Sequence, residues 1–541
     1  MSLRNLIKSI SKREWAVVGI VSVVVIALTA IPPLFGYLIG ASRGLEWTGL
    51  QVFAPGDFGV YLSYIEQGRA GSPFMENFFT TAPTVPVFNI LWFSVGQLAW
   101  MFSLSAIAAF HVARSLLIPA LLVVTYVATA YFLPKARDRI AAFLMMAFGS
   151  GLGLYFAPLF AGMKPTLTGH EWPIDLWVAE ANIFASMSYS PHFVASWSLF
   201  IIAALMLVMA FDNCRMRYAA VAGAAALVLF SFHPFHAPTL FALGLVYLVV
   251  RRNFRGKEAL RRWAVYVIFV AISAPAVLYH YFITTFDTFA KEALAANTCI
   301  TPAPWHFIIG FGAFALLAPA GVVLLRSKRA EFHHARFLIV WVVVCLALVY
   351  SPLTFQRRLL EGLQFPLAIM AAPVALAVIR WGKKRLPVSE LFLAAALFFV
   401  FLFPSSFAVI TRNVTMYSEN RPPIFYLSPD RSAALGWIRD NTAPDAAFMS
   451  DFSSGYNIAG WAYRTVYVGH WVNSGDIKAK MEDARRFFGE MDEGEKAKFM
   501  LGNRLDYIFV GPDERELGGF VEGDMFELLY SEGKIDVFRL K

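Results

Sequence analysis

The chain has 541 residues, of which 58% are hydrophobic and only 15% are charged. Soluble globular proteins carry about 25% charged residues, so this composition excludes an ordinary soluble protein. The net charge of +9 is carried by short basic clusters between long apolar runs, which is typical of helices oriented in a bilayer and argues against nucleic acid as a partner.

The first predicted elements are a basic N-terminal segment, residues 1–15, and an apolar span over about residues 16–38. Because basic residues stay on the cytoplasmic side, the N-terminus is expected there. Residues 40–83 are polar and rich in Gly and Pro, and we place them outside as the first outer loop. Residues 84–102 are apolar, but a full span there would put the basic group at 135–139 on the wrong side. We therefore expect a helix that lies in or dips into the outer leaflet.

The following spans alternate across the membrane, and their basic clusters fall on one side. The expected spans cover residues 111–133, 140–160 and 192–211, then two joined outside by residues 233–238, then four ending near residues 282, 326, 351 and 380, and a last one ending near 407. The fold class is therefore mainly α, a polytopic protein with about eleven transmembrane helices. We expect it in the cytoplasmic (inner) membrane of a bacterium or archaeon.

Near residue 411 the composition changes, because charges become frequent and no apolar run is long enough to span. The patterns predict helices and short strands in alternation, which favours a small α/β domain. The predicted helices cover residues 432–441, 478–488 and 493–501, and the strands cover 447–449, 465–468, 506–510 and 535–538. We divide the chain into a transmembrane domain, residues 1–410 with in-plane helices up to 105, and an extracytoplasmic α/β domain, residues 411–541.

Asp57 stands just before a helix-like run in the first outer loop, residues 59–67. A carboxylate just above the membrane can act as general base toward an acceptor hydroxyl or amine. Aspartate is also a preferred N-cap, and the spacing alone favours this capping role. Tyr61 and Glu66 lie in the same run and are further candidates to line a substrate cavity.

Arg357 and Arg358 are the basic pair that falls on the outer side, against the charge rule. Guanidinium groups bind phosphate bidentately and keep their charge when half-buried, so a specific phosphate site is the favoured interpretation. The alternative is a salt bridge to Glu361 together with contacts to lipid headgroups.

The outer histidines form another group: His192, His233 and His236 on the membrane side, with His470 and Glu361 as further cavity candidates. The spacing of His233 and His236 around a Pro-Phe pair can ligate a metal. Histidines at an interface are more often hydrogen-bonded anchors, so we assign no metal ligand and expect no required cofactor.

The arrangement of one span, an outer loop with an aspartate, an in-plane helix and a Pro-rich apolar helix resembles the GT-C glycosyltransferases, including the protein O-mannosyltransferases and the lipid A aminoarabinose transferase. Most of the resemblance lies in Gly56-Asp57, Tyr61, Gly68, residues 81–86, residues 102–105 and Ala113-Arg114. Residues 433–442 and 464–470 add a resemblance to the periplasmic domains of many bacterial members.

The resemblance implies a sugar donor carried on a polyprenyl phosphate or pyrophosphate, with transfer on the outer face. It also implies that Asp57 is the catalytic base or positions the acceptor. Two features depart from the family pattern. Asp57 is followed by Phe58, where many members carry a second acidic residue. Trp461 and Trp471 stand alone, without the oligosaccharyltransferase signature, which argues against transfer of whole oligosaccharides to asparagine.

The hypothesis from the sequence is an inverting, polyprenyl-phosphate-sugar-dependent glycosyltransferase with Asp57 as base and Arg357 and Arg358 on the donor phosphate. Its expected partners are the lipid-linked donor, a lipid, glycan or protein acceptor, and membrane lipids. A lipid-linked glycan ligase or polymerase is one alternative. A non-enzymatic scaffold for envelope assembly, or a transporter, is the other, although repeated halves and charged residues at mid-membrane are not evident.

Overall fold

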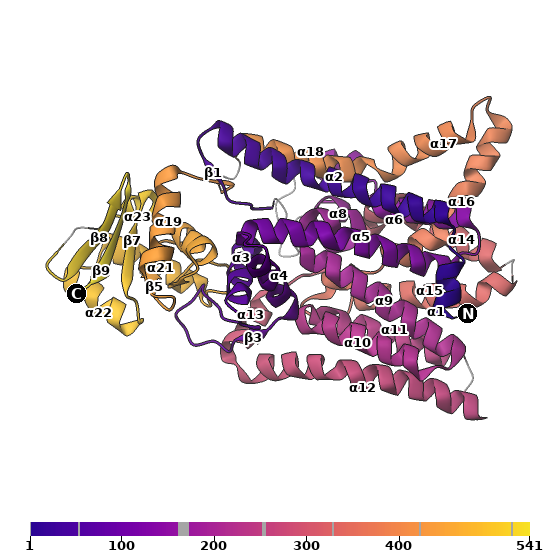
Figure 1. Cartoon of the computed structure of the whole chain (residues 1–541), viewed down its shortest axis with the longest axis horizontal. Coiled ribbons are helices and arrows are strands. Elements are labelled where there is room, and N and C mark those ends of the chain that lie inside the picture. The colour runs from indigo at the N-terminus through magenta and orange to yellow at the C-terminus, as the bar shows by residue number, and fades with distance from the viewer. Residues whose placement is uncertain are drawn as a thin grey trace. The chain divides into compact units, whose positions relative to one another are not determined.

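The computed structural model describes residues 2–51, 55–160, 172–251, 256–326, 329–420, 424–520 and 523–541, with the side chains of 325, 326 and 329–333 left aside. Two compact units make up the chain. The first comprises Met1–Ile31, His111–Tyr281 and Thr298–Arg412, and the second comprises Pro32–Phe110, Phe282–Asn297 and Asn413–Lys541. Figure 1 shows the chain and labels many of its helices and strands.

Long apolar helices dominate the chain, as the hydropathy pattern predicts. Within the described residues, seven stretches are long and apolar enough to cross a membrane, and a pair bent by 55° makes an eighth if it counts as one span. The seven are α2 (Lys12–Ser42), α5 (Ala106–Phe132), α6 with α7 (Ala136–Phe148, Gly153–Phe160), α9 (Pro191–Asn213), α12 (Gly256–Phe286), α14 (Trp305–Arg326) and η4 with α16 (Gln356–Leu360, Gln364–Arg385). The bent pair is α17 with η5 and α18 (Glu390–Leu397, Phe398–Leu402, Pro404–Glu419).

The remaining predicted spans fall on shorter apolar stretches. These are α10 (Met216–Phe232), α11 (Ala237–Val250) and, within α15 (Arg329–Leu348), the stretch His334–Leu348. With 17 residues α10 is about 25 Å long, below the roughly 30 Å of a hydrocarbon core. Helix length and composition therefore do not confirm the predicted number of about eleven transmembrane helices. The hydropathy of the sequence does not show where a helix ends early.

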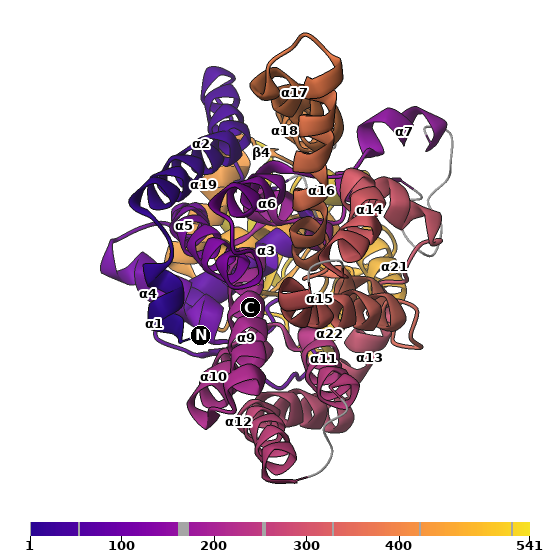
Figure 2. The same ribbon diagram turned by 90° about the vertical axis from the view of Figure 1, so that its right-hand side faces the viewer.

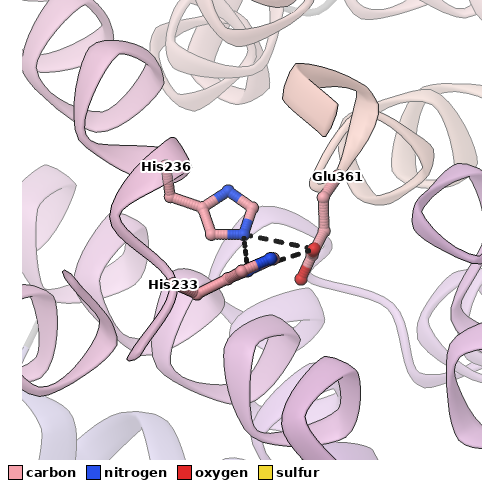
Figure 3. Close-up of side chains that lie close together, drawn as sticks. All are labelled: His233, His236 and Glu361. Atoms are coloured by element: carbon pink, nitrogen blue, oxygen red, sulfur yellow. Dashed lines mark hydrogen bonds and ion pairs between the residues drawn. The ribbon is translucent and has the colours of Figure 1, made fainter. Parts of the chain in front are cut away.

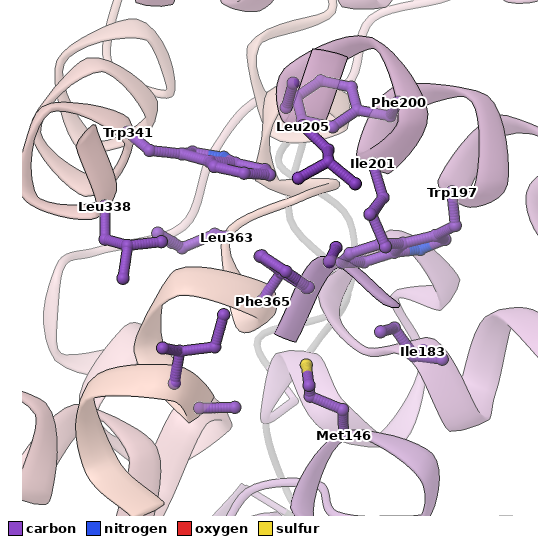
Figure 4. Close-up of a cluster of buried hydrophobic side chains, with 14 of the residues drawn as sticks. Met146, Ile183, Trp197, Phe200, Ile201, Leu205, Leu338, Trp341, Leu363 and Phe365 are labelled. Carbon is purple, nitrogen blue, oxygen red and sulfur yellow. The ribbon is translucent and has the colours of Figure 1, made fainter. Parts of the chain in front are cut away.

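The core of the first unit forms around α9. Of the 18-residue apolar stretch of α9, 89% is buried, whereas only 17% of the corresponding stretch of α12 is buried. Helix α9 is therefore central and α12 peripheral. The end-on view in Figure 2 separates these two helices. Large aromatic side chains pack here: the Trp341 ring lies 5.4 Å from the rings of both Phe200 and Phe365 (Figure 4).

One glycine fixes the chain beside this core. Gly362 adopts a φ of +97°, and a Cβ there would come within 2.8 Å of the Phe200 ring. Only glycine therefore lets the segment between η4 and α16 pass so close to α9. The neighbouring residue, Glu361, is held in the interior by this passage, at 0% exposure.

The second unit begins with short elements from the region predicted as outer loop. Strand β1 (Glu46–Trp47) pairs with β4 (Tyr426–Leu427), and β2 (Phe74–Met75) pairs with β3 (Val87–Phe88). The helices of this part are α3 (Pro55–Arg69), α4 (Ile90–Met101) and α13 (Thr288–Ala296). With 12 residues, α4 is too short to cross a bilayer, as expected for an in-plane helix.

A five-stranded sheet with flanking helices forms the C-terminal part of this unit. The strand order is β6-β5-β7-β9-β8; β5 runs parallel to β6 and β7, while β9 is antiparallel to both of its neighbours. The strands are β5 (Ala447–Met449), β6 (Thr465–Val466), β7 (Tyr507–Val510), β8 (Phe526–Glu532) and β9 (Ile535–Leu540). The helical segments are α19 (Pro429–Asn441), α20 (Phe452–Asn457), η6 (Ile458–Ala462), α21 (Ile477–Gly489), α22 (Glu493–Gly502) and α23 (Pro512–Glu516). The mixed architecture agrees with the predicted α/β domain.

Candidate functional site

Asp57 lies in the first turn of α3, a turn that a tyrosine from α20 holds in place. The Tyr456 hydroxyl accepts a hydrogen bond from the Gly59 N–H at 3.0 Å and donates one to the Pro55 carbonyl at 2.6 Å. Because α3 begins at Pro55, Asp57 lies inside the helix and does not occupy the N-cap position that the spacing favoured. A carboxylate in a first turn is still favoured by the helix dipole.

His470 faces this carboxylate from the C-terminal part of the same unit. Its Nε2 atom lies 3.7 Å from Asp57 Oδ1, and it has no hydrogen-bond partner within the described residues. Its Nδ1 atom accepts backbone N–H groups from Val472 at 3.1 Å and Asn473 at 3.0 Å. The proton of the neutral ring is therefore assigned to Nε2, where it points at the carboxylate.

Aromatic side chains surround the pair. Desolvation, together with the negative charge of Asp57, raises the pKa of Tyr64 to about 12, so this phenol stays protonated. The Trp471 side chain is 62% exposed and packs against Phe452, with ring centroids 4.9 Å apart. Its indole also borders Gly56, since a Cβ there would lie 3.7 Å from Trp471 Cδ1. The buried imidazole is thus next to a half-exposed carboxylate and an open aromatic face.

The structure places the other two candidates of α3 differently. Tyr61 stacks on Trp92 with a ring separation of 4.7 Å, which gives it a packing role. Glu66 lines a separate cavity of about 400 Å³ together with Arg69 and Tyr463. The sequence did not single out Tyr456, whose contact with α3 depends on segments far apart in the chain.

A second group of predicted residues meets in the first unit. His233 follows the last residue of α10, His236 ends the short helix η3 (Pro234–His236), and Glu361 follows η4. His236 Nε2 lies 2.8 Å from His233 Nδ1 and 3.1 Å from Glu361 Oε2, while His233 Nδ1 lies 3.8 Å from the same oxygen (Figure 3). The Ser196 hydroxyl of α9 donates to the other carboxylate oxygen, Oε1. All three side chains are buried.

His192 borders this cluster at the start of α9. Its ring centroid lies 5.7 Å from that of His233, and its Nδ1 atom pairs with the Ser190 hydroxyl at 2.7 Å. The structure therefore brings together the predicted residues His192, His233, His236 and Glu361, which come from three separate stretches of sequence.

Arg357 and Arg358 lie in η4 and are held by aromatic rings. The guanidinium of Arg357 stacks 4.5 Å from the Trp177 ring centroid, and that of Arg358 stacks 4.5 Å from Phe235. Within the described residues Glu361 pairs with the histidines and not with either arginine, so the predicted alternative of a salt bridge to Glu361 is wrong. Stacking fixes the guanidinium plane while its N–H edge stays in that plane, which suits bidentate contact with an anion.

Solved structures that share this fold include those of an oligosaccharyltransferase and of ArnT. The archaeal oligosaccharyltransferase AglB from Archaeoglobus fulgidus, in complex with an inhibitory peptide and a dolichol-phosphate, aligns at 12% identity over 90% of this chain and 69% of its own, with a TM-score of 0.54. ArnT from Cupriavidus metallidurans, bound to undecaprenyl phosphate, aligns at 10% identity over 95% of this chain and 97% of its own, with a TM-score of 0.52.

Comparison of the sequence alone gives no further assignment, because neither a family model nor a curated protein matches it. At identities this low, the structural similarity establishes the fold and not the activity. Together with its apolar helices, it shows that the chain is a multi-pass membrane protein with the fold of the GT-C glycosyltransferases.

Proposed function

We propose that this protein is an inverting glycosyltransferase that moves a sugar from a polyprenyl-phosphate donor to an acceptor on the outer face of a bacterial or archaeal cytoplasmic membrane. The observation that carries the proposal is the pairing of Asp57 with the Nε2 atom of His470. The fold supports it, because the structures of AglB and ArnT contain dolichol-phosphate and undecaprenyl phosphate.

Asp57 acts as general base in this mechanism. One carboxylate oxygen takes the proton of the acceptor hydroxyl or amine, while Oδ1 faces the N–H of His470. The deprotonating acceptor atom attacks the anomeric carbon, and the bond from that carbon to the phosphate oxygen breaks. The electron pair leaves with the phosphate, and a single displacement inverts the anomeric configuration.

Arg357 and Arg358 bind the donor phosphate. Their stacking on Trp177 and Phe235 holds two guanidinium groups in fixed orientations. Negative charge builds on the phosphate oxygen as the glycosyl bond breaks, and preorganised cations stabilise that charge without reorganisation. Phosphate is already a good leaving group, so the mechanism needs no strong acid beside it.

The acceptor is a lipid, glycan or protein carrying a hydroxyl or amine. The exposed face of Trp471, next to the Asp57–His470 pair, offers an apolar surface on which such a group can rest. The N-terminus is cytoplasmic and the C-terminal part of the second unit extracytoplasmic, as the basic clusters predict.

The test is sugar transfer by purified protein carrying Asp57→Asn. A general base contributes about 10²–10⁴-fold, so transfer should fall by that factor while the protein level and melting temperature stay unchanged. Asp440→Asn is the matched control, because Asp440 is an exposed carboxylate of the same unit, paired with Arg439, and should keep full activity. Equal transfer by wild type and Asp57→Asn would remove Asp57 from the mechanism.

A further inference from the structure

Three potential ligand atoms converge in the interior of the first unit. The separations among His233 Nδ1, His236 Nε2 and Glu361 Oε2 are 2.8, 3.1 and 3.8 Å (Figure 3). Around a zinc ion bound at about 2.0–2.1 Å, tetrahedral ligand atoms lie roughly 3.3 Å apart. The observed triangle brackets that value, so one small cation can reach all three atoms with little movement.

Hydrogen bonding within the chain leaves this cluster incompletely satisfied. The single proton on Nε2 of His236 cannot be donated both to His233 Nδ1 and to Glu361 Oε2. Within the described residues, Glu361 Oε2 forms no hydrogen bond. Both His236 and Glu361 are 0% exposed. A buried carboxylate oxygen without a hydrogen bond is costly, and a bound cation would satisfy it.

The surroundings hold the carboxylate in a ligand-like orientation. Ser196 donates to Glu361 Oε1, which leaves Oε2 directed at the two imidazoles. Gly362, with its φ of +97°, lets Glu361 approach α9. Metal-binding carboxylates are held by outer hydrogen bonds of this kind.

We propose that His233, His236 and Glu361 bind a divalent transition metal, for which Zn²⁺ is the best match. Two imidazoles and one carboxylate form a ligand set that zinc accepts, whereas Mg²⁺ and Ca²⁺ prefer oxygen ligands. Three protein ligands leave a fourth position for water or an anionic oxygen, as in open zinc sites. The binding of metal does not depend on the proposed transferase activity.

The experiment uses the full chain in detergent, stripped with a chelator and titrated with Zn²⁺ alone. We expect one equivalent in the wild type and at least about 100-fold weaker binding in His236→Ala and in Glu361→Gln, because each loses a direct ligand. Ser196→Ala loses only an outer hydrogen bond and should bind roughly 10-fold more weakly. His334→Ala is the matched control; His334 pairs with Asp212, about 24 Å along α9 from Ser196, and its removal should leave affinity unchanged.

Folding and ligation are separated by a second measurement. Size-exclusion profiles establish that each variant is folded, and the visible spectrum of the Co²⁺-loaded wild type should show a low-symmetry site that Glu361→Gln alters. Absence of saturable Zn²⁺ binding by the wild type, or equal affinity in wild type and both cluster variants, would overturn the proposal. Zn²⁺ binding is measured without any sugar substrate. A protein that binds Zn²⁺ but transfers no sugar would therefore count against the proposed transferase activity and not against the metal site.

Discussion

In the proposed site, Asp57 is the side chain that reacts and His470 is one that positions it. The two backbone N–H groups bonded to His470 Nδ1 set the tautomer, and the buried ring then presents Nε2–H to the carboxylate at 3.7 Å. The sequence indicated Asp57 through its family resemblance and His470 only as a weak candidate. Their pairing could not be predicted, because it depends on how two distant segments fold against each other.

The positioning role of His470 is tested with His470→Asn. The asparagine oxygen can still accept the N–H groups of Val472 and Asn473, but the donor facing Asp57 is lost. We expect transfer to fall about 10-fold, with the acidic limb of the pH profile moved to higher pH, since the donor favours the charged carboxylate. A merely structural role would change the melting temperature and leave the pH profile in place.

At the scale of elements, apolar runs and turn residues predicted most helices and several strands. The strand at residues 447–449 and the helix at 478–488 lie within a residue of β5 and α21. Strand β8 was missed, because a bulge between Leu528 and Tyr530 breaks its alternation. The sequence indicated His233, His236 and Glu361 as separate candidates but did not predict that they meet, because Glu361 joins the two histidines through tertiary packing.

The first turn of α3 depends on one hydroxyl. Tyr456→Phe removes the group that joins Gly59 N–H to the Pro55 carbonyl, so we expect a loss of about 1–2 kcal/mol in the free energy of unfolding and a fall in transfer. Denaturant unfolding in detergent measures the first effect. Tyr530→Phe is the control, because among the residues that the structure describes its hydroxyl bonds only to the exposed Glu532. Equal effects of both variants would contradict the role assigned to Tyr456.

At the scale of the whole molecule, apolar composition and basic clusters predicted a polytopic helical protein with a C-terminal α/β part. The number of spans was harder to predict, since α10 and α11 are shorter than a hydrocarbon core requires. A buried carboxyl group inside the second unit, that of Glu514, links the stability of this unit to pH. Burial first, and then the charge of Asp451, raises the pKa of Glu514 to about 8.

The sign of this pH dependence follows from the raised pKa of Glu514. The folded protein binds the proton more tightly than the unfolded chain, so the contribution is complete below the unfolded pKa of about 4.5 and is lost as pH rises through about 8. We expect the melting temperature to fall from pH 5 to pH 9, and Glu514→Gln to flatten that slope. Glu516→Gln, on the same helix, should keep it. An unchanged slope in Glu514→Gln would show that other groups control the dependence.

The proposed function requires that a polyprenyl phosphate carries the sugar. The most direct measurement follows radiolabelled sugar from a panel of polyprenyl-phosphate sugars into acceptor, in membranes that contain the wild type, Asp57→Asn or no added protein. We predict transfer only with the wild type, and none when nucleotide sugars replace the lipid-linked donors. Equal label in all three membranes, or transfer from nucleotide sugars alone, would contradict the proposed function.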